Sequence, residues 1–346
     1  MLAYQLVEWQ QPPELREVEV PEPGPGEILV KVGGAGACHS DLHVMEWPAG
    51  VLPYELPFTL GHENAGWIES VGAGVTGWEP GDAVAVYGPW GCGRCRSCRA
   101  TLETLCEHGA EIGAAGGGLG RDGGMAEYML VPDPRLLVAL GDLDPRDAAP
   151  LSDAALTPYH ALKLALPKLT PGTCVLVIGI GGLGHMAVQL VRALTPSDVI
   201  AVDVDPAKLR LAREVGATAT VQAGESAATE IAELTGGRGA TLVLDCVGND
   251  GTLALDVKAV AAGGSVMVIG VAGGKLPLTF GTMRFDASIT YPYWGSAIEL
   301  AEVLELARSG RIHAHVERFP LDRAPDAYQR MRDGSLTGRA VITPNG

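Results

Sequence analysis

The sequence predicts an α/β protein of two domains, in which a β-rich part is joined to a doubly wound parallel sheet. Up to about residue 150, short extended segments alternate with turns rich in Gly and Pro, a pattern typical of irregular β structure. After residue 150, continuous apolar runs alternate with helical stretches, as in a parallel sheet that helices cover on both faces. A chain of 346 residues is also too long for one ordinary core.

In the β-rich part, residues 27–32, 65–71 and 82–86 are predicted to be strands, and the Gly-rich residues 113–124 a loop. In the second part, the expected strands are 173–179, 199–203, 219–222, 241–246 and 265–270. The expected helices are a stretch ending at 194, then 206–215, 226–235, 251–262 and 297–308, the last with Gly310 as its C-terminal cap. No internal repeat occurs.

The composition indicates a globular chain that does not bind polyanions. Apolar residues make up 47%, and 25 basic residues face 41 acidic ones, for a net charge of −16. Because no basic stripe occurs, neither nucleic acid nor an anionic membrane is expected as a partner. No signal peptide or membrane-spanning run is visible, so we expect a soluble, cytoplasmic protein. In that compartment its seven cysteines are metal ligands or buried thiols rather than disulfides.

The segment 36–43 is dense in residues that bind metals or move protons. Cys38 lies 24 positions before His62, and a thiolate with an imidazole forms half or more of a zinc site. Asp41 could accept the second ring N–H of a ligating histidine, while Ser40 and His43 would lie beside the metal and pass a proton outward. The alternative is a buried cysteine among polar loop residues.

Four cysteines, Cys92, Cys95, Cys98 and Cys106, occur within 15 residues. Four sulfurs around one ion, with no open position, describe a structural zinc site. An iron–sulfur cluster is a rival interpretation, but its common bacterial pattern places the fourth cysteine three residues on and before a proline; here seven residues intervene and Glu107 follows. Disulfides, or buried cysteines with no shared role, would also account for the four residues.

A glycine-rich turn follows the first strand of the second part. In the context strand, turn, helix, strand and acid, this turn predicts a dinucleotide-binding site whose pyrophosphate lies at a helix N-terminus. Asp203, at the end of the next strand, would hold the adenosine ribose hydroxyls and repel a 2′-phosphate, which favours NAD over NADP. The turn contains Gly179, Gly181, Gly182, Leu183 and Gly184.

Together, these motifs resemble the zinc-dependent medium-chain alcohol dehydrogenases over essentially the whole chain, and among them the bacterial NAD-dependent secondary-alcohol dehydrogenases. The resemblance implies a GroES-like catalytic domain formed by residues 1–153 and 296–346, which would carry a catalytic and a structural zinc. A Rossmann NAD-binding domain would comprise residues 154–295. The resemblance also implies that the protein forms a homodimer or a homotetramer.

The resemblance supplies further site residues. Asp153 stands where many members have a cysteine as the third ligand of the catalytic zinc; its alternative role is a helix N-cap. Glu63 resembles a carboxylate behind the ligands that can transiently approach the metal. The implied cofactor contacts are His39 at the phosphates, Lys208 at the adenosine ribose (or a solvated helix lysine), Arg339 at the pyrophosphate and Thr157 near the nicotinamide.

The implied reaction is the oxidation of an alcohol to a ketone or aldehyde, and its reverse, with NAD. Ser40 would take the hydroxyl proton and pass it through the nicotinamide ribose to His43. We expect medium-sized apolar secondary alcohols and ketones, because the implied pocket is largely aromatic; rival readings are a primary alcohol, a polyol, or a non-catalytic nucleotide-binding protein. The pocket residues would be Trp47, Tyr54, Leu119, Tyr293 and Trp294, each of which could instead be core or subunit contact.

Overall fold

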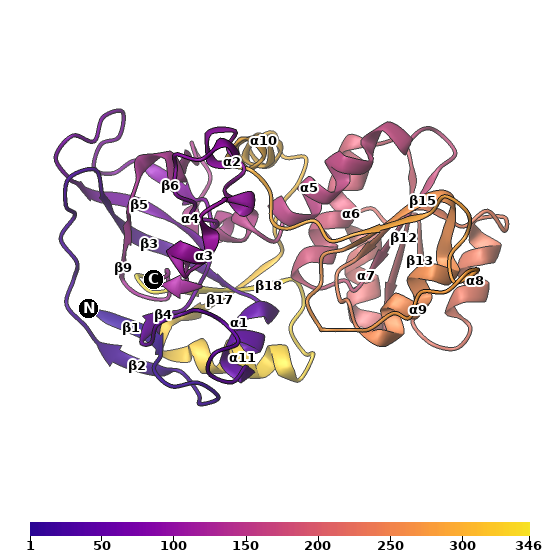
Figure 1. The fold of residues 1–346 in the computed structure, drawn as a ribbon, viewed down its shortest axis with the longest axis horizontal. Helices are drawn as coiled ribbons and strands as arrows, with labels where there is room; N and C mark the ends of the chain where they lie inside the picture. Colours follow the sequence, from indigo (N-terminus) through magenta and orange to yellow (C-terminus); the bar gives the residue numbers. More distant parts are fainter. The chain divides into compact units, whose positions relative to one another are not determined.

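A computed structural model describes all residues, 1–346, and they form two compact units (Figure 1). Unit 1 comprises residues 1–156, 295–310 and 314–346. Unit 2 comprises residues 157–294 and 311–313. None of the helices combines the length with the apolar composition that spanning a bilayer requires.

Unit 2 is built on a six-stranded parallel sheet in the order β13-β12-β11-β14-β15-β16. Helices α6 and α7 contact each other and strands β11 to β13, while α8 and α9 contact each other and strands β13 to β15. The strand order reverses between β11 and β14, the place where open α/β sheets bind ligands. The strands are β11 (Cys174–Ile178), β12 (Asp198–Asp203), β13 (Ala219–Gln222), β14 (Ala240–Asp245), β15 (Val260–Val268) and β16 (Ser288–Thr290). The helices are α5 (Leu156–Ala165), α6 (Gly182–Leu194), α7 (Pro206–Glu214), α8 (Ala227–Leu234) and α9 (Asp250–Ala259).

The predicted doubly wound sheet is thus confirmed, with shifts at element ends. The predicted helix 251–262 ends at Ala259, because Val260 is β-branched and enters β15 with extended dihedral angles. The apolar side chains of the strands meet those of α8 and α9 in a buried core, in which Leu176, Val243 and Ile231 are at most 1% exposed.

Unit 1 has a seven-stranded sheet in the order β10-β6-β5-β3-β18-β17, with β9 paired to β3, and a three-stranded sheet β2-β1-β4. Strands from both ends of the chain meet, since β18 pairs antiparallel with β3. The strands are β1 (Leu2–Leu6), β2 (Glu14–Glu17), β3 (Ile28–Ala37), β4 (Phe58–Thr59), β5 (Glu63–Val71), β6 (Ala83–Val86), β7 (Gly116–Gly117), β8 (Gly120–Arg121), β9 (Tyr128–Val131), β10 (Leu137–Ala139), β17 (Val316–Pro320) and β18 (Arg339–Thr343). The helices are α1 (His39–Glu46), α2 (Arg96–Arg99), α3 (Gly109–Ile112), α4 (Pro145–Ala148), α10 (Ala297–Arg308) and α11 (Ala324–Arg332), with the 3₁₀ turn η3 (Ala149–Ser152).

Candidate metal centres and dinucleotide-binding turn

Three adjoining elements of unit 1 bring together Cys38, His62 and Asp153. Cys38 lies between β3 and α1, His62 directly precedes β5, and Asp153 directly follows η3. The pairs β3·β5, β3·η3 and β5·η3 are all in contact. Asp153 is the C-cap residue of η3 and lies three residues before α5 begins; its role as metal ligand and the alternative role as helix N-cap both stay predictions.

The distances within this group suit a small cation. Asp153 Oδ2 lies 3.6 Å from His62 Nε2 and 4.0 Å from Cys38 Sγ. With Glu63, the ligand atoms of the group lie within 4.8 Å of one another. Tetrahedral zinc, with bonds of about 2.0–2.3 Å, separates its ligand atoms by roughly 3.3–3.8 Å. One soft sulfur, one imidazole nitrogen and one carboxylate are a donor set that zinc accepts, so these residues fit the metal.

Asp41 orients the imidazole of this group. It is fully buried, and its Oδ1 lies 2.9 Å from His62 Nδ1. Its Oδ2 accepts a 2.9 Å bond from the Cys38 backbone N–H and a 2.8 Å bond from the Tyr328 hydroxyl. A carboxylate beside Nδ1 favours the tautomer with the proton there, which leaves the Nε2 lone pair directed at Asp153 and Cys38.

The charged groups around His62 change its pKa. Burial opposes a charge on His62, but the charge of Asp41 and the hydrogen bonds that the imidazole makes to Asp153 and Cys38 prevail and hold the pKa of His62 well above its usual range. A divalent cation would take the place of that proton, since metal binding and protonation compete for the same lone pair.

Glu63 and Arg339 form a buried ion pair behind the ligands. Arg339 Nε donates a 2.8 Å bond to Glu63 Oε2, and its Nη2 contacts Glu63 Oε1. Glu63 Oε1 also accepts from the backbone N–H of Ala154 at 3.1 Å, while Arg339 Nη2 lies 3.7 Å from Asp153 Oδ2. Burial raises the pKa of Glu63 to about 7, against the lowering effect of Arg339. Gly36 leaves room for this carboxylate, because a Cβ there would overlap Glu63 Oε2.

The first turns of α1 carry the remaining polar residues predicted around the metal. Ser40 Oγ lies 3.3 Å from His62 Nε2, at the point where the ligands converge. His43, half-buried, stacks on Trp47 with ring centroids 6.4 Å apart. His39 is exposed at the start of the helix. The roles assigned to these side chains stay predictions.

The four predicted sulfurs, from Cys92, Cys95, Cys98 and Cys106, lie within 4.8 Å of one another, and none of them is in a disulfide. Backbone N–H groups point at the sulfurs: those of Cys95 and Cys98 approach Cys92 Sγ and Cys95 Sγ, each at 3.4 Å. Backbone hydrogen bonds of this kind lower the pKa of Cys92 to about 6, and the bond from the Arg94 N–H contributes most. Thiolates held this way suit a tetrahedral zinc.

Arg135 ties this lobe to the sheet. Its Nη1 lies 2.6 Å from Glu103 Oε1 and its Nη2 donates a 2.7 Å bond to the Gly91 carbonyl, while Nε reaches Asp133 at 3.1 Å. Burial raises the pKa of Glu103, which is only 8% exposed. Arg135 thus connects Glu103 and the Gly91 carbonyl of the lobe to Asp133.

In unit 2, the predicted glycine turn runs from the end of β11 into α6. Gly181 is the N-cap of the helix, and Gly182 and Leu183 are its first residues. Gly184 has to be a glycine, because a Cβ there would overlap the carbonyl oxygen of Gly179. Asp203, at the end of β12 and 8% exposed, accepts a 2.6 Å bond from the backbone N–H of Ile180, so its carboxylate lies against the turn.

The remaining predicted contacts fall in both units. Thr157 is buried at the start of α5, and Lys208 is half-buried on α7. Of the predicted pocket residues, Trp47, Tyr54 and Leu119 belong to unit 1, and Tyr293 and Trp294 to unit 2. Trp294 is 4% exposed and packs edge-on against Tyr293. A pocket that contains all five stays a prediction.

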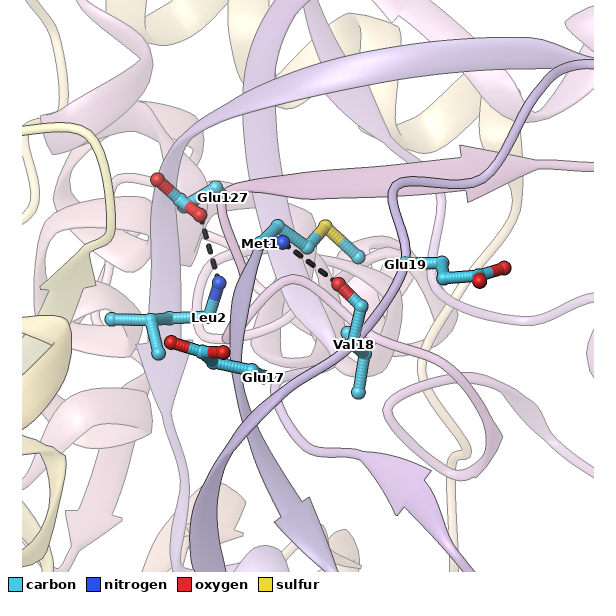
Figure 2. Close-up of a pocket in the computed structure, with 6 residues that line it drawn as sticks. All are labelled: Met1, Leu2, Glu17, Val18, Glu19 and Glu127. Atoms are coloured by element: carbon cyan, nitrogen blue, oxygen red, sulfur yellow. Dashed lines mark hydrogen bonds between the residues drawn. The ribbon is translucent and has the colours of Figure 1, made fainter.

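A surface hollow in unit 1 contains no predicted site residue. It is lined by Met1, Leu2, Glu17, Val18, Glu19 and Glu127 (Figure 2). Glu127 accepts the backbone N–H of Leu2 at 2.8 Å, and the amino group of Met1 donates to the Val18 carbonyl at 2.7 Å.

Sequence reasoning missed Tyr328, Glu103 and Arg135 at the two metal centres. Tyr328 lies 287 positions from Asp41, and no local pattern marks it. Nor does any motif mark Arg135, which meets Glu103 across 32 positions.

A buried thiolate, imidazole and carboxylate group, in a chain that also carries a dinucleotide-binding turn, defines a metal-dependent dehydrogenase. Residues 24–142 match the alcohol dehydrogenase GroES-like domain, and residues 182–309 match the zinc-binding dehydrogenase domain. The alcohol dehydrogenase structure from Aeropyrum pernix is 36% identical, with a TM-score of 0.92 over 99% of this chain and 100% of that one.

Two further proteins are similar over nearly their full lengths. The D-arabinose 1-dehydrogenase (NADP(+)) of Saccharolobus solfataricus is 34% identical over 98% of this chain and 96% of its own. The acetophenone reductase of Geotrichum candidum, solved in complex with NAD, is 30% identical, with a TM-score of 0.86 over 99% of this chain and 96% of that one.

The chain belongs to the zinc-dependent medium-chain alcohol dehydrogenase family. It is an enzyme, a zinc-dependent NAD(P) alcohol dehydrogenase with two candidate zinc sites. The predicted fold class, a GroES-like part with a Rossmann sheet, is confirmed.

Proposed function

We propose that this enzyme interconverts secondary alcohols and ketones, with NAD as the hydride acceptor. The observation that carries the chemistry is the convergence of the buried Cys38 Sγ and His62 Nε2 with Asp153 Oδ2, whose side chain is 13% exposed. When bound there, zinc would act as a Lewis acid and make a substrate hydroxyl easier to deprotonate. Two anionic ligands and one neutral imidazole would leave a fourth position for substrate.

Within that scheme, the chain's own residues move the proton. Ser40 Oγ, 3.3 Å from His62 Nε2, is placed to accept the hydroxyl proton of the substrate while its own proton passes on, through the nicotinamide ribose, to His43. His43, one helical turn further along α1 and half-exposed, would release the proton outward, since one imidazole nitrogen can accept a proton while the other donates one. Asp41 keeps the His62 proton on Nδ1 and so keeps Nε2 available.

The preference for NAD over NADP rests on Asp203. Its carboxylate lies against the glycine turn through the Ile180 N–H bond, where it would accept bonds from ribose hydroxyls and repel a 2′-phosphate. Lys208 at the ribose, and His39, Arg339 and Thr157 at the rest of the dinucleotide, are proposed contacts. Residues 1–153 with 296–346 would form the catalytic domain, and residues 154–295 the NAD-binding domain.

The secondary-alcohol preference rests on the aromatic pocket candidates and on the similarity to a protein named as an acetophenone reductase. A sugar or polyol is the rival substrate class, supported by the similarity to a D-arabinose dehydrogenase. Initial rates with matched secondary alcohols, primary alcohols and D-arabinose, each with NAD and with NADP, decide between them. Fastest NADH formation from secondary alcohols supports the proposal, whereas fastest turnover of primary alcohols or arabinose, or of NADP, contradicts it.

We further propose a cytoplasmic homodimer or homotetramer. Large apolar side chains are exposed around the edge strand β16: Phe280 is 96% exposed, Phe285 78% and Tyr291 69%. An exposed apolar edge of this kind is typical of a surface covered by another copy. Light scattering would test this, because Phe285→Asp should shift the mass toward the monomer, and a wild-type monomer would contradict it.

A further inference from the structure

Unit 2 contains two buried carboxyl groups that the proposed reaction does not use. Asp245 is the last residue of β14, and Asp256 lies in the middle of α9. Both residues are 0% exposed. Burying an ionised carboxylate is costly unless the charge is paired or hydrogen-bonded.

The two carboxyl groups differ in their hydrogen bonds. Asp245 Oδ1 accepts the backbone N–H groups of Val247 at 2.8 Å and of Gly248 at 2.9 Å. No N–H or hydroxyl group donates a hydrogen bond to Asp245 Oδ2 or to either carboxyl oxygen of Asp256. Because N–H bonds stabilise the ionised form, the negative charge belongs on Asp245, and Asp256 is the group that holds a proton.

No cation compensates these groups. Elements packed against α9 include α8, β14 and β15, of which β15 contains no charged residue. The loop after β15 also meets the start of α9, where the backbone N–H of Lys275 donates to Asp250 Oδ1, and the side chains of Lys275 and Asp250 are exposed. The groups that act on this region are themselves acidic or thiol groups, and the charged side chains of α8 and the lysine of α9 are exposed. The groups near the pair are Asp203 and Cys246. The exposed charged side chains are Glu230 and Glu233 on α8 and Lys258 on α9.

One proton shared by the two carboxyl groups would remove one of the two buried charges and would also give a partner to carboxyl oxygens that lack a donor. A protonated Asp256 would donate to Asp245, a side-chain bond that would satisfy one orphaned oxygen on each side. Burial, and then the charge of Asp245, raise the pKa of Asp256 to about 9. Two like carboxylates in one site generally hold one proton between them.

The pair lies beside the dinucleotide-binding turn. Strands β11 and β14 are neighbours at the reversal of the strand order, and the backbone N–H of Cys246 donates to the Ile178 carbonyl at 2.8 Å. Val247 packs so closely on Gly179 that a Cβ at Gly179 would overlap its Cγ2. The loop whose N–H groups Asp245 holds is thus in contact with the first glycine of the turn.

We propose that Asp256 retains a proton that it shares with Asp245, and that this pair positions the loop 246–248 against the dinucleotide-binding turn. Asp256 is then a positioning residue for NAD binding. It acts through Asp245 and the loop, without touching the cofactor.

A proton held only in the folded chain makes stability depend on pH. The unfolded Asp256 loses its proton near the ordinary carboxyl pKa of about 3.9, whereas the folded one keeps it up to about pH 9. Between these values folding takes up one proton, so stability falls as pH rises, by up to about tenfold in the folding constant per pH unit. Above pH 9 the folded pair becomes doubly charged and should release the loop.

Asp256→Asn tests both consequences. The amide has nearly the same shape, donates to Asp245 at every pH and cannot ionise. We expect its Tm relative to the wild type to rise by roughly 2–4 °C per pH unit between pH 5 and 8. Glu233→Gln makes the same chemical change at an exposed position of α8 and should follow the wild type. Parallel curves for wild type and Asp256→Asn would overturn the shared proton.

The second arm measures NADH binding by fluorescence and rests on the proposed NAD-binding function. The wild-type Kd should weaken by about fivefold or more between pH 8 and 10, and that of Asp256→Asn should not. Equal pH dependence in both would overturn the positioning role, whereas no NADH binding at any pH would contradict the proposed function and leave the Tm arm decisive. If Asp256→Asn does not fold, Asp256→Ser, a smaller non-ionising donor, replaces it.

Discussion

Tyr328 donates a 2.8 Å hydrogen bond to Asp41, although the two residues lie near opposite ends of the chain. Figure 1 shows α11, which carries Tyr328, next to α1. Tyr328 is 1% exposed and Asp41 0%, so the bond is shielded from water. Asp41 Oδ1 also lies 2.9 Å from His62 Nδ1. Asp41 therefore links the phenol of Tyr328 to the imidazole of His62, which is one of the candidate metal ligands.

Tyr328→Phe should therefore weaken metal retention without removing a ligand. The hydroxyl donates to a charged acceptor, a bond worth about 1.5–3 kcal/mol, and loss of partners behind metal ligands typically costs about 10–100-fold in metal affinity. Competition with a chelator measures the affinity, and the visible spectrum of the cobalt-substituted enzyme reports a change in ligand geometry. Tyr4→Phe is the matched control, because Tyr4 stacks on Tyr328 at 6.2 Å. Equal effects of both variants would show a packing role only.

The carboxylate assigned as the third ligand gives a second prediction. Asp153→Ala should lower the zinc content from two ions per chain to one and abolish nearly all activity, because two ligands hold zinc poorly. Asp153→Cys should keep both ions, since a thiolate is an equally suitable donor. Metal content is measured by atomic emission, with Asp147→Ala, a half-buried aspartate that pairs with Arg318, as control. An Asp153→Ala enzyme that keeps two zinc ions and its activity would refute the assignment.

The centre of each site follows from local sequence. Cys38 and Asp41 stand at the two ends of the first helical turn of α1, so their proximity depends only on spacing. The four-cysteine lobe is equally local, since its sulfurs come from 15 consecutive positions. Even the doubly wound sheet follows from short-range patterns, because apolar runs and helical periods alternate along the chain.

Contacts across the fold could not be predicted. Nothing near Arg339 in the sequence indicates that its guanidinium meets Glu63, 276 positions away. Asp153 came only from the resemblance, because neither its neighbours nor its spacing mark a ligand. Asp256 did carry a signal: it lies three residues from both Leu253 and Ala259, the buried residues of α9. An acid on the apolar face of a helix indicates an unusual proton or partner.

A third prediction concerns the anchor of the cysteine lobe. Arg135→Ala removes the partner of the buried Glu103 and the bond to the Gly91 carbonyl, which should cost about 1–3 kcal/mol. One of the two zinc ions should then reach a chromogenic chelator faster, while the catalytic ion is released at its normal rate. Arg99→Ala removes an exposed arginine of the same lobe and should change neither rate. If Arg135→Ala releases zinc no faster than Arg99→Ala, the sulfurs alone hold the lobe.

The last prediction separates two roles of Arg339. Its guanidinium is 5% exposed and bound to Glu63, while the resemblance gives it a place at the pyrophosphate. Arg339→Met leaves Glu63 buried without its partner, which should cost about 3–5 kcal/mol of stability. Combining it with Glu63→Gln removes the orphaned charge and should recover part of that loss. Arg332→Met, at an exposed ion pair with Glu46, should cost no more than about 1 kcal/mol.

The NADH affinity of the double variant, Arg339→Met with Glu63→Gln, decides whether Arg339 also contacts the pyrophosphate. The double variant is suited to this test because part of the lost stability is restored in it. A Kd weakened by about tenfold or more would mean that the positive charge also acts on the pyrophosphate, since charge-assisted bonds to phosphate are strong. An unchanged Kd would restrict Arg339 to holding Glu63, and through the Ala154 N–H bond the segment that carries Asp153. In that case zinc retention, and not cofactor binding, should fall in Arg339→Met.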